Sequence, residues 1–435
     1  MGGALQHIRG RLLWLTALPD NEGHPGVHYL QDGVLSVQGE HIQAVRSYAQ
    51  YVAQGGQDAE LHDVRPGLIL PGFIDSHIHY PQMDIIGSFG TQLLDWLDNY
   101  AFPAELAYTD REFAQAQAQQ FMRRLFEHGT TTALTFTTVH AHSTDALFEA
   151  AQAVNARMIA GKVLMNRNAP DGLLDAGTGD DENRALLERW HGRGRLAYAI
   201  TPRFAITCTP EQLTAAGQLL LDYPGVYSHS HIAEHPDEVA YTLQLFPEAQ
   251  DYADVYDRFG LLNDHSVFAH GIHLTEQELT RFHKAGASVA FCPTSNLFLG
   301  SGLLNLPKLQ QFGVGFSVGS DVGGGTGFSL LSTLGEGYKV NQLNGDNWHP
   351  LQALYAITRG AAETLHLADK VGSLSAGLEA DFVVLEPPRA SVLAQRLDAE
   401  SSLTGELFAY MFLDGERAVK ETWVAGKRRY QREAA

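Results

Sequence analysis

The chain contains 435 residues, 44% hydrophobic and 18% charged, so it can form a large globular domain with a smaller one beside it. Fifty acidic residues against thirty lysines and arginines give a formal net charge of −20. This balance excludes the broad basic surface that a nucleic-acid partner requires, and it favours a small substrate that is neutral or cationic.

The two cysteines, Cys208 and Cys292, are too few for a disulfide framework or a thiolate zinc site, so a cytoplasmic location is expected. No apolar run reaches the roughly 18 residues of a membrane span, so no membrane partner is expected.

Strands and turns are predicted at both ends of the chain, with a repeating strand–helix pattern between them. Residues 8–70 form short apolar segments separated by Gly, Asp and Asn. Short apolar runs then alternate with stretches of helical period. The runs cover 73–80, 131–138, 157–165, 195–201, 226–232, 266–271, 288–293 and 314–321, and the clearest helices cover 110–128, 143–155, 210–222 and 274–285. A last helical region at 350–368 precedes a strand-rich tail.

Eight strand-like runs in about 250 residues match the size of a (β/α)₈ barrel. The sequence therefore predicts an α/β fold with a TIM-like (β/α)₈ barrel over residues 72–370. Because the two strand-rich ends flank this barrel, residues 1–71 and 371–435 are expected to pair into one small composite β-sandwich domain.

The first apolar run contains the string DSHIH (75–79). Alternate residues of a strand share a face, so His77 and His79 point the same way. Two imidazoles at this spacing can bind one Zn²⁺ at about 2.0–2.1 Å. Asp75 lies one step deeper on that face and is expected to orient a ligand imidazole. Taken alone, the motif also fits two ordinary histidines on an exposed strand.

A second H-x-H occurs in YSHSHIAEH (227–235). A barrel uses the C-terminal ends of its strands for chemistry, so His231 is the predicted ligand, and His229, two residues deeper, is expected in the core or behind a ligand. Glu234, in the following loop, can reach over the metal as a proton carrier. The alternative for Glu234 is a solvated loop carboxylate.

Two further strands end in His270 and Asp321. Three histidines and one aspartate leave a coordination position for water, whose pKa a bound Zn²⁺ can lower to about 7. His270 is expected to hold that water and the developing oxyanion, with a buried structural histidine as the alternative.

Several strings together resemble the metal-dependent amidohydrolase superfamily, in its deaminase and chlorohydrolase branch. They are PGFIDSHIHYP (71–81), HIAEH (231–235), FAHG (268–271), GSDVG (319–323) and GSLSAGLEADFVVL (372–385). The resemblance covers essentially the whole chain. It implies a distorted barrel with a composite β-sandwich, a homodimer, and one Zn²⁺ held by His77, His79, His231 and Asp321.

Binuclear relatives in this superfamily bridge two metals with a carboxylated lysine at the end of the fourth strand. Here the fourth strand, RLAYAIT (195–201), leads to Arg203, and Lys162 lies on the third strand, where a structural role is expected. One metal ion per chain is therefore predicted. A site of this kind can also accept Fe²⁺.

Longer strings resemble the members of this branch that deaminate guanine. They are HIHYPQ (77–82), LLDWLDNYAFPAE (93–105), GTTTAL (129–134), ITPRFA (200–205) and CPTSNLFLGSG (292–302). The resemblance implies that a zinc-bound hydroxide converts guanine to xanthine and ammonia. Glu234 would protonate N3 of the base and later the leaving amine, and Asp321 would accept the proton of the water.

The same resemblance implies which residues hold the base. Gln82 offers an amide to a purine edge, Arg203 a planar donor fork toward O6 and N7, and Phe204 a stacking face, with His231 and Glu234 bordering the ring. The alternatives are a solvated loop amide at Gln82 and a salt-bridged arginine beside a core aromatic at 203–204.

Two further segments bear on the site. Residues 93–105 are predicted to form an amphipathic helix with Leu93, Leu94, Leu97 and Tyr100 on its apolar face, which either covers the site as a lid or simply packs on the barrel. The segment SDVGGGTGFS (320–329) lacks the G-K-[ST] of a phosphate loop, so its glycines are expected to let the backbone approach the metal site.

Three other functions are alternatives to this prediction. Another aminohydrolase or a triazine chlorohydrolase would share the metal site and differ only in the pocket. A non-catalytic assembly protein on the same barrel is opposed by the presence of all four ligands together with Glu234. The zinc fold of cytidine deaminases is excluded, because the chain has no C-x-x-C.

Overall fold

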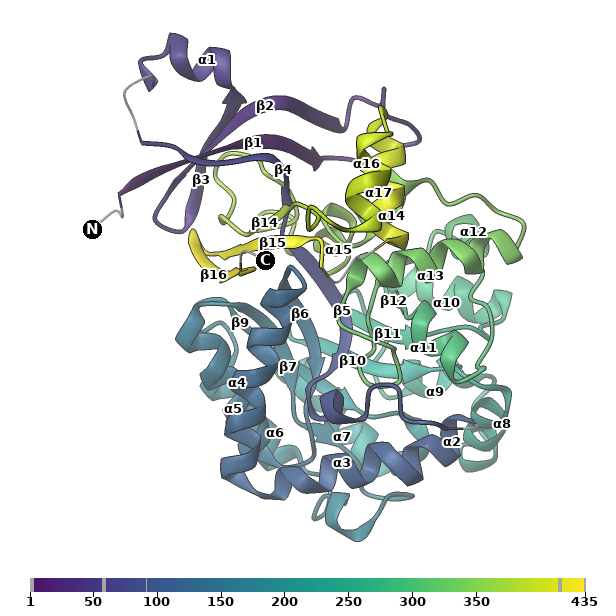
Figure 1. Cartoon of the computed structure of the whole chain (residues 1–435). Coiled ribbons are helices and arrows are strands. Elements are labelled where there is room, and N and C mark those ends of the chain that lie inside the picture. The colour runs from purple at the N-terminus through teal and green to yellow at the C-terminus, as the bar shows by residue number, and fades with distance from the viewer. Residues whose placement is uncertain (1–3, 57–59, 91, 414–416, 434–435) are drawn as a thin grey trace.

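The computed structural model describes residues 4–56, 60–90, 92–413 and 417–433, and their strands form two separate sheets (Figure 1). The larger sheet is the barrel of the middle of the chain, and the smaller one combines strands from both ends. The predicted α/β fold, a (β/α)₈ barrel with a small β unit from the two termini, is confirmed.

Eight parallel strands follow one another around the barrel in sequence order. They are β5 (Phe73–His79), β6 (Thr130–Phe136), β7 (Arg157–Gly161), β9 (Leu196–Pro202), β10 (Tyr227–Ile232), β11 (Ser266–His270), β12 (Ser288–Phe291) and β13 (Gly315–Val318). Each coincides with one predicted run. The run 157–165 differs in one respect: it is interrupted at Lys162, after which the two-residue β8 (Val163–Leu164) pairs with β9.

The barrel closes between its last strand and its first. The backbone N–H of Asp321 donates to the carbonyl of His77 at 2.9 Å, and the N–H of His79 donates to the carbonyl of Val322 at 2.9 Å. Gly319 lies at this seam, where an added Cβ would stand 2.7 Å from the Cβ of His77. Only glycine therefore lets the end of β13 pass so close to β5.

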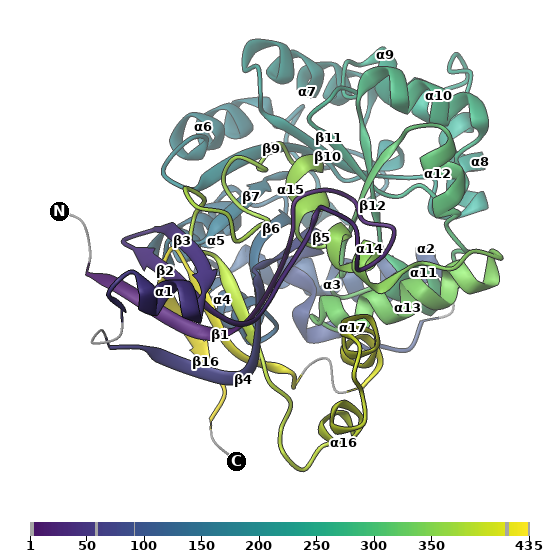
Figure 2. The same ribbon diagram turned by 90° about the horizontal axis from the view of Figure 1, so that it is seen from above.

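Helices surround the barrel on the outside (Figures 1 and 2). The four predicted helices are present as α4 (Arg111–Glu127), α5 (Ala141–Val154), α7 (Pro210–Asp222) and α10 (Glu276–Ala285). The others between α4 and the end of the barrel region are α6 (Asp180–Trp190), α8 (Pro236–Leu245), α9 (Tyr252–Arg258), α11 (Pro293–Phe298), α12 (Leu306–Gln311), α13 (Leu330–Leu343), α14 (Pro350–Ala356) and α15 (Arg359–Thr364). In α4, Asp110 caps the first turn, and Ala114, Ala118 and Phe121 bury one face at helical spacing.

The two ends of the chain meet in a mixed seven-stranded sheet with the order β16-β15-β14-β4-β1-β2-β3. Its strands are β1 (Leu5–Leu15), β2 (Val27–Gln38), β3 (His41–Ser47), β4 (His62–Pro71), β14 (Phe382–Leu385), β15 (Val419–Val424) and β16 (Lys427–Gln431). The N-terminal β4 pairs antiparallel with the C-terminal β14, with Leu70 opposite Val383. The predicted pairing of the two ends is thus confirmed, while the exact boundaries predicted at 71/72 and 370/371 stay predictions.

This sheet is joined directly to the barrel. β4 ends at Pro71 and β5 begins at Phe73, so the chain runs from one sheet into the other through Gly72 alone (Figure 1). Arg195, next to β9, forms buried ion pairs with Glu379 and Asp381 beside β14. Helix α1 (Tyr48–Ala53) packs against β2 and β3 of the smaller sheet. Helix α16 (Val392–Asp398) packs on α17 (Leu403–Phe412), which lies against α13 and α14.

The predicted amphipathic helix over 93–105 is present as three consecutive helical pieces: α2 (Leu93–Trp96), the π-helical turn η3 (Leu97–Ala101) and α3 (Phe102–Leu106). The apolar face predicted for it is partly wrong, since the side chain of Leu94 is 41% exposed and Tyr100 is only half-buried. Leu93 and Leu97 are buried as predicted, together with Trp96, Ala101 and Phe102. The π-turn over 97–101 accommodates more residues than an α-helical turn, which changes the face on which the residues after it lie.

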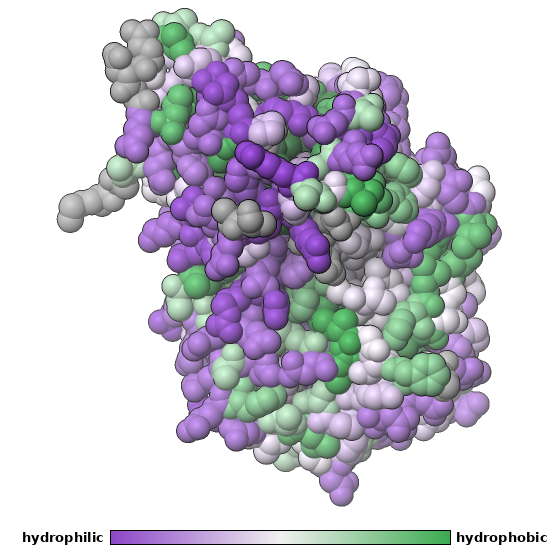
Figure 3. Space-filling view, in the orientation of Figure 1, coloured by the Kyte–Doolittle hydropathy of each residue, from purple (hydrophilic) through white to green (hydrophobic). Residues whose placement is uncertain are grey.

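Within the described ranges, the structure contains no helix that is both long enough and apolar enough to cross a bilayer. On the face shown in Figure 3, hydrophilic residues predominate and hydrophobic ones occur in patches among them. Both cysteines are free and buried.

Candidate active site

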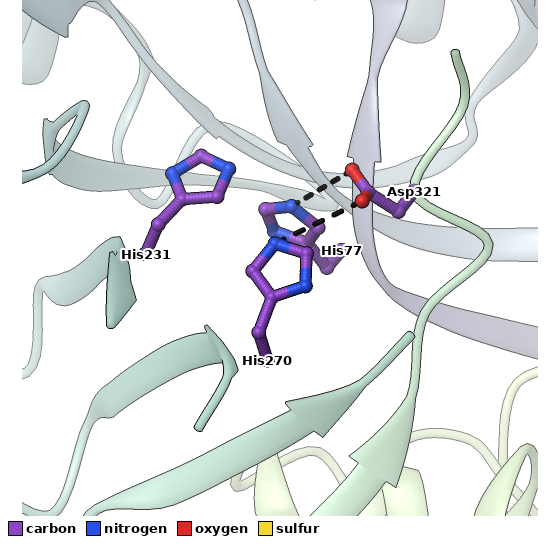
Figure 4. Close-up of side chains that lie close together, drawn as sticks. All are labelled: His77, His231, His270 and Asp321. Atoms are coloured by element: carbon purple, nitrogen blue, oxygen red, sulfur yellow. Dashed lines mark ion pairs between the residues drawn. The ribbon is translucent and has the colours of Figure 1, made fainter. Parts of the chain in front are cut away.

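The predicted metal ligands lie together at the C-terminal ends of barrel strands. His77 and His79 are on β5, His231 is on β10, His270 ends β11, and Asp321 follows β13 by three residues. Figure 4 shows the rings of His77, His231 and His270 and the carboxylate of Asp321 gathered around one small space. The ligand atoms of these four residues all lie within 4.8 Å of one another.

His79 completes this group from the same strand as His77. Its Nε2 lies 3.2 Å from Nε2 of His77 and 3.2 Å from Nε2 of His231. Oδ1 of Asp321 lies 3.2 Å from Nε2 of His77 and 3.4 Å from Nε2 of His79. A tetrahedral zinc site with ligand distances of about 2.0–2.1 Å has edges of about 3.3–3.4 Å. The spacing of these donors therefore fits one tetrahedral metal ion.

The protonation of the histidines supports the same conclusion. Burial lowers the pKa of His77 and His231, and it lowers the pKa of His79 to about 3, so all three rings are neutral near pH 7. Nδ1 of His77 faces Nε2 of His229 at 2.8 Å, and Nδ1 of His231 faces the carbonyl oxygen of Arg203 at 2.6 Å. At His231 the carbonyl oxygen requires the proton on Nδ1, which leaves the converging Nε2 as a lone-pair donor, an arrangement that a cation stabilises.

Asp75 does not play the predicted part. Its carboxylate accepts hydrogen bonds from the backbone N–H groups of Ser320, at 3.0 Å, and His77, at 3.2 Å, and from the hydroxyl of Ser320 at 2.5 Å. Burial raises its pKa to about 7. The prediction that Asp75 orients a ligand imidazole is wrong, because the carboxylate is occupied by the backbone of β5 and of the Asp321 loop; the residue behind His77 is His229.

Two of the converging residues have a backbone conformation that L-amino acids rarely adopt. The φ angle is +71° at His270 and +51° at Asp321. Neither residue is a glycine, so the surrounding hydrogen bonds must hold this strain. The glycines of 320–329 have the predicted effect at Gly323, where an added Cβ would lie 2.4 Å from the carbonyl oxygen of Gln82.

His270 and Glu234 form the side of the cluster that faces the cavity. Nε2 of His270 lies 3.4 Å from Oε2 of Glu234 and 3.8 Å from Oδ2 of Asp321, and its Nδ1 faces Oδ1 of Asn296 at 2.8 Å. Oε1 of Glu234 accepts a hydrogen bond from the hydroxyl of Ser301 at 2.9 Å. Burial, together with the charge of Asp321, raises the pKa of Glu234 to about 8, so this carboxyl group carries a proton near pH 7.

Glu238, which the sequence analysis missed, holds the loop of Glu234. It accepts hydrogen bonds from the backbone N–H groups of Glu234 at 2.7 Å and His235 at 3.2 Å, and from the hydroxyl of Tyr252 at 2.8 Å. It is the third residue of α8 and completes a capping box with His235. The string HPDE after HIAE was the available signal, because a glutamate three residues after an N-cap is typical of this motif.

A cavity opens beside the metal cluster. Its lining includes the three residues predicted to hold the base, Gln82, Arg203 and Phe204, together with Glu234 and Glu238, and an apolar wall. This wall is formed by Leu93, Trp96, Leu97 and Leu299. The structure thus brings every predicted site residue to one cavity and its adjoining metal cluster.

Glu105 is a second residue that the sequence analysis missed. This fully buried carboxylate accepts hydrogen bonds from Nη1 of Arg203, which is 2.7 Å from both carboxylate oxygens, and from Nε2 of Gln82 at 2.9 Å. A glutamate among the apolar residues of the string AFPAE was the available signal, since a buried acid requires a partner.

Lys162 lies outside the cavity lining and forms a buried ion pair with Asp175 and a second ion pair, at 3.4 Å, with the exposed Glu182. Its position agrees with the structural role expected for it. The residues that line the cavity include no lysine.

A parallel barrel that gathers histidines and an aspartate at its strand ends is the architecture of a metal-dependent hydrolase. The family model described as Amidohydrolase family matches residues 68–429. The chain is 44% identical over 431 residues to the guanine deaminase of Escherichia coli (strain K12), covering 98% of each sequence. The solved structure of E. coli guanine deaminase superimposes with a TM-score of 0.94 at 43% identity, covering 99% of this chain and 100% of that one.

The guanine deaminase of C. acetobutylicum, solved with guanine bound in its active site, is also similar to this chain. It is 26% identical, with a TM-score of 0.88 and coverage of 98% of this chain and 100% of that one. The chain therefore belongs to the amidohydrolase family. Within that family it is one of the guanine deaminases, which are aminohydrolases.

Proposed function

We propose that this chain hydrolyses guanine to xanthine and ammonia, with one Zn²⁺ held by His77, His79, His231 and Asp321 and with Glu234 as the proton carrier. The observation that carries the proposal is the position of Glu234. Its protonated carboxyl group lies between the metal cluster and a cavity that contains Arg203 and Phe204. The guanine bound in the C. acetobutylicum relative supports the choice of base.

When bound, Zn²⁺ supplies a nucleophile at neutral pH, because it lowers the pKa of a coordinated water from 15.7 to about 7. Three imidazole nitrogens and one carboxylate oxygen are a donor set typical of Zn²⁺, and Fe²⁺ is the other ion that such a set accepts. Metal analysis of the purified protein distinguishes the two.

The protein groups move the protons of the reaction. Glu234 donates its proton to N3 of guanine, which makes C2 electrophilic, and Asp321 accepts a proton from the attacking water. A C2–O bond forms and the bond from C2 to the amino group breaks. Glu234 then takes the proton of the new hydroxyl on C2 and delivers it to the departing amine, which leaves as ammonia. N3 keeps its proton in xanthine, and the proton held by Asp321 returns to Glu234. His270 stabilises the attacking oxygen.

The base is held by the residues on the far side of the cavity. Nη1 of Arg203 is engaged by Glu105, and the remaining N–H groups of the guanidinium can donate to O6 and N7. The Oε1 atom of Gln82 accepts from the N–H of Gly323 at 3.2 Å and retains a lone pair for an N–H of the base. Phe204 offers a stacking face, and stacking of a base on an aromatic ring contributes about 1–3 kcal/mol.

The experiment is a steady-state assay of ammonia release from guanine, adenine and cytosine and of chloride release from a chlorotriazine, with and without a chelator. We expect turnover of guanine, loss of activity with the chelator and recovery on addition of Zn²⁺. Activity on another substrate without activity on guanine would overturn the proposed substrate. Full activity in a protein shown to contain no metal would overturn the proposed metal.

The homodimer stays a prediction from family resemblance. Light scattering of the purified protein tests it, and a mass near twice the 47.6 kDa of one chain is the expected result.

A further inference from the structure

Glu105 is buried beside the cavity, and the proposed reaction assigns it no step. It lies on α3, near the end of the helical segment 93–106, and its side chain is 0% exposed. Such a carboxylate is stable in the interior only when charged or polar partners surround it. Its partners, Arg203 and Gln82, are two of the three residues proposed to hold the base.

The contacts fix both partners in position. One nitrogen of Arg203, Nη1, lies 2.7 Å from each oxygen of Glu105. This contact fixes the guanidinium at Nη1 and does not use its other nitrogens, Nε and Nη2. A second residue of α3, Phe102, lies with its ring centre 5.1 Å from Cζ of Arg203. Because residues three apart share a helix face, one face of α3 holds Arg203 through an ion pair and an aromatic ring.

The same carboxylate determines how the amide of Gln82 is turned. Nε2 of Gln82 donates to Glu105 at 2.9 Å, and Oε1 accepts from the backbone N–H of Gly323 at 3.2 Å. The acceptor Glu105 and the donor N–H of Gly323 thus distinguish the nitrogen end of the amide from its oxygen end. A flipped amide would place oxygen against the carboxylate and nitrogen against an N–H, so only one orientation is stable.

We propose that Glu105 is the positioning residue for base recognition: it orients Arg203 and Gln82 together, and through them sets the preference for a base that carries the O6 carbonyl. This inference rests on the proposed function and deepens it. The effect of Glu105 concerns how the base is held. Glu105 touches none of the proposed metal ligands, and its link to them runs through Gln82, whose Nε2 lies 3.3 Å from Nδ1 of His79.

The helical segment 93–106 therefore contributes to the cavity in two ways. Leu93, Trp96 and Leu97 at its start form the apolar wall of the cavity, and Glu105 near its end holds the polar groups opposite the metal. Movement of this segment away from the barrel would separate Glu105 from both partners, so covering the cavity and orienting Arg203 are linked.

The test compares guanine with 2-aminopurine, which has the same amino group at C2 but lacks the O6 carbonyl. The variants are Glu105→Gln, which removes the charge with little change of shape, and Glu105→Asp, which keeps the charge on a shorter side chain. Asp98→Asn, an acid-to-amide change at an exposed position of the same segment, is the matched control. Metal content and the thermal midpoint of unfolding are measured for every variant.

We expect Glu105→Gln to lower kcat/KM for guanine by about 100-fold, the size of effect that misplacement of a binding group by about 1 Å produces. For 2-aminopurine we expect a fall of less than about 10-fold, because no O6 contact is lost. Metal content should equal that of the wild type. Glu105→Asp should change the ratio of the two kcat/KM values in the same direction but less, and Asp98→Asn should leave this ratio unchanged.

If kcat/KM falls equally for guanine and 2-aminopurine, so that their ratio is unchanged, the inference is overturned. Failure of both Glu105 variants to fold would also overturn it, since Glu105 would then serve stability alone. If Glu105→Gln alone fails to fold, Glu105→Asp decides. The wild-type protein separates this inference from the proposed function: absence of guanine turnover in the wild type overturns the function, whereas turnover with an unchanged ratio in the variants overturns only the role of Glu105.

Discussion

The metal end and the base-reading end of the cavity are built by different parts of the fold. The metal end consists of His77, His79, His231 and Asp321, and the base-reading end of Gln82, Glu105, Arg203 and Phe204. Every member of the metal end stands on a barrel strand or within three residues of one. The base-reading end instead depends on a contact between the loop after β9 and a helix 98 positions earlier in the chain.

The two ends nevertheless meet at two residues: Nε2 of Gln82 lies 3.3 Å from Nδ1 of His79, and Arg203 contacts both ends. Arg203 holds Glu105 with its side chain, and its carbonyl oxygen faces Nδ1 of His231 at 2.6 Å. The side chain thus belongs to the base-reading end and the backbone to the metal end. A change of the side chain can therefore separate recognition from metal binding, because the backbone contact remains.

The largest effect is expected from Glu234→Gln, at the border between the two ends. Glutamine has the same shape but no proton to transfer, so we expect kcat to fall by about 10²–10⁴-fold. Metal content should stay at the wild-type level, since Glu234 is not among the proposed ligands. Single-turnover kinetics and metal analysis are the measurements. A near-normal kcat would contradict the proton-carrier role.

The next effect tests the base-reading end. Arg203→Lys replaces a planar donor fork by a point charge, which can pair with Glu105 but cannot also reach O6 and N7. We expect kcat/KM for guanine to fall by about 100-fold, mainly through KM, with full metal content. Steady-state kinetics over a range of guanine concentrations measure the split. Loss of metal in this variant would show that the two ends are not separable.

The contrast also explains what could be predicted from the sequence. The ligands followed from strand periodicity and from the rule that barrel strands carry chemistry at their C-terminal ends, so spacing alone led to His231 rather than His229. The partner of Asp75 could not be predicted, because it depends on which backbone N–H groups of the distant Asp321 loop lie against β5.

Glu105 was missed for a related reason. Helical period places residues on faces but does not give the buried side of a helix that contains a π-turn, and it says nothing of an ion pair with a residue 98 positions away. The resemblance to a family supplied Gln82, Arg203 and Phe204. The residue that holds two of them became visible only when the tertiary packing was known.

A smaller effect is expected at the metal end from Asp75→Asn. The amide oxygen can still accept from both backbone N–H groups at the position of Oδ1. The amide nitrogen replaces Oδ2, which now accepts from the hydroxyl of Ser320, and this loosens Ser320 and with it Asp321. We expect the affinity for Zn²⁺ to fall by about 10–100-fold, while KM for guanine at saturating Zn²⁺ stays near normal. Competition with a chelator measures the affinity.

Asp381→Asn, at a buried aspartate outside the metal end that pairs with Arg195, controls for general destabilisation. An equal loss of Zn²⁺ affinity in this control would mean that Asp75 contributes to stability and not to the metal end.

The smallest effect concerns the loop between the two ends and appears in the pH dependence of stability. Burial raises the pKa of Glu238 from 4.5 to about 7. Between these values the folded protein keeps a proton that the unfolded chain has lost. The stabilisation linked to this proton is therefore complete below about pH 4.5 and is lost as the pH rises through about 7, a change of at most about 3 kcal/mol.

Glu238→Gln removes this titration and keeps a residue that fits the capping box. We expect its free energy of unfolding, measured by denaturant titration between pH 4.5 and 8, to fall less steeply with rising pH than that of the wild type. Glu278→Gln changes the same capping-box position in α10 and measures what an amide alone does there. If the wild type and Glu238→Gln show the same slope, the proton on Glu238 does not contribute to stability, and the loop that carries Glu234 is held by its hydrogen bonds alone.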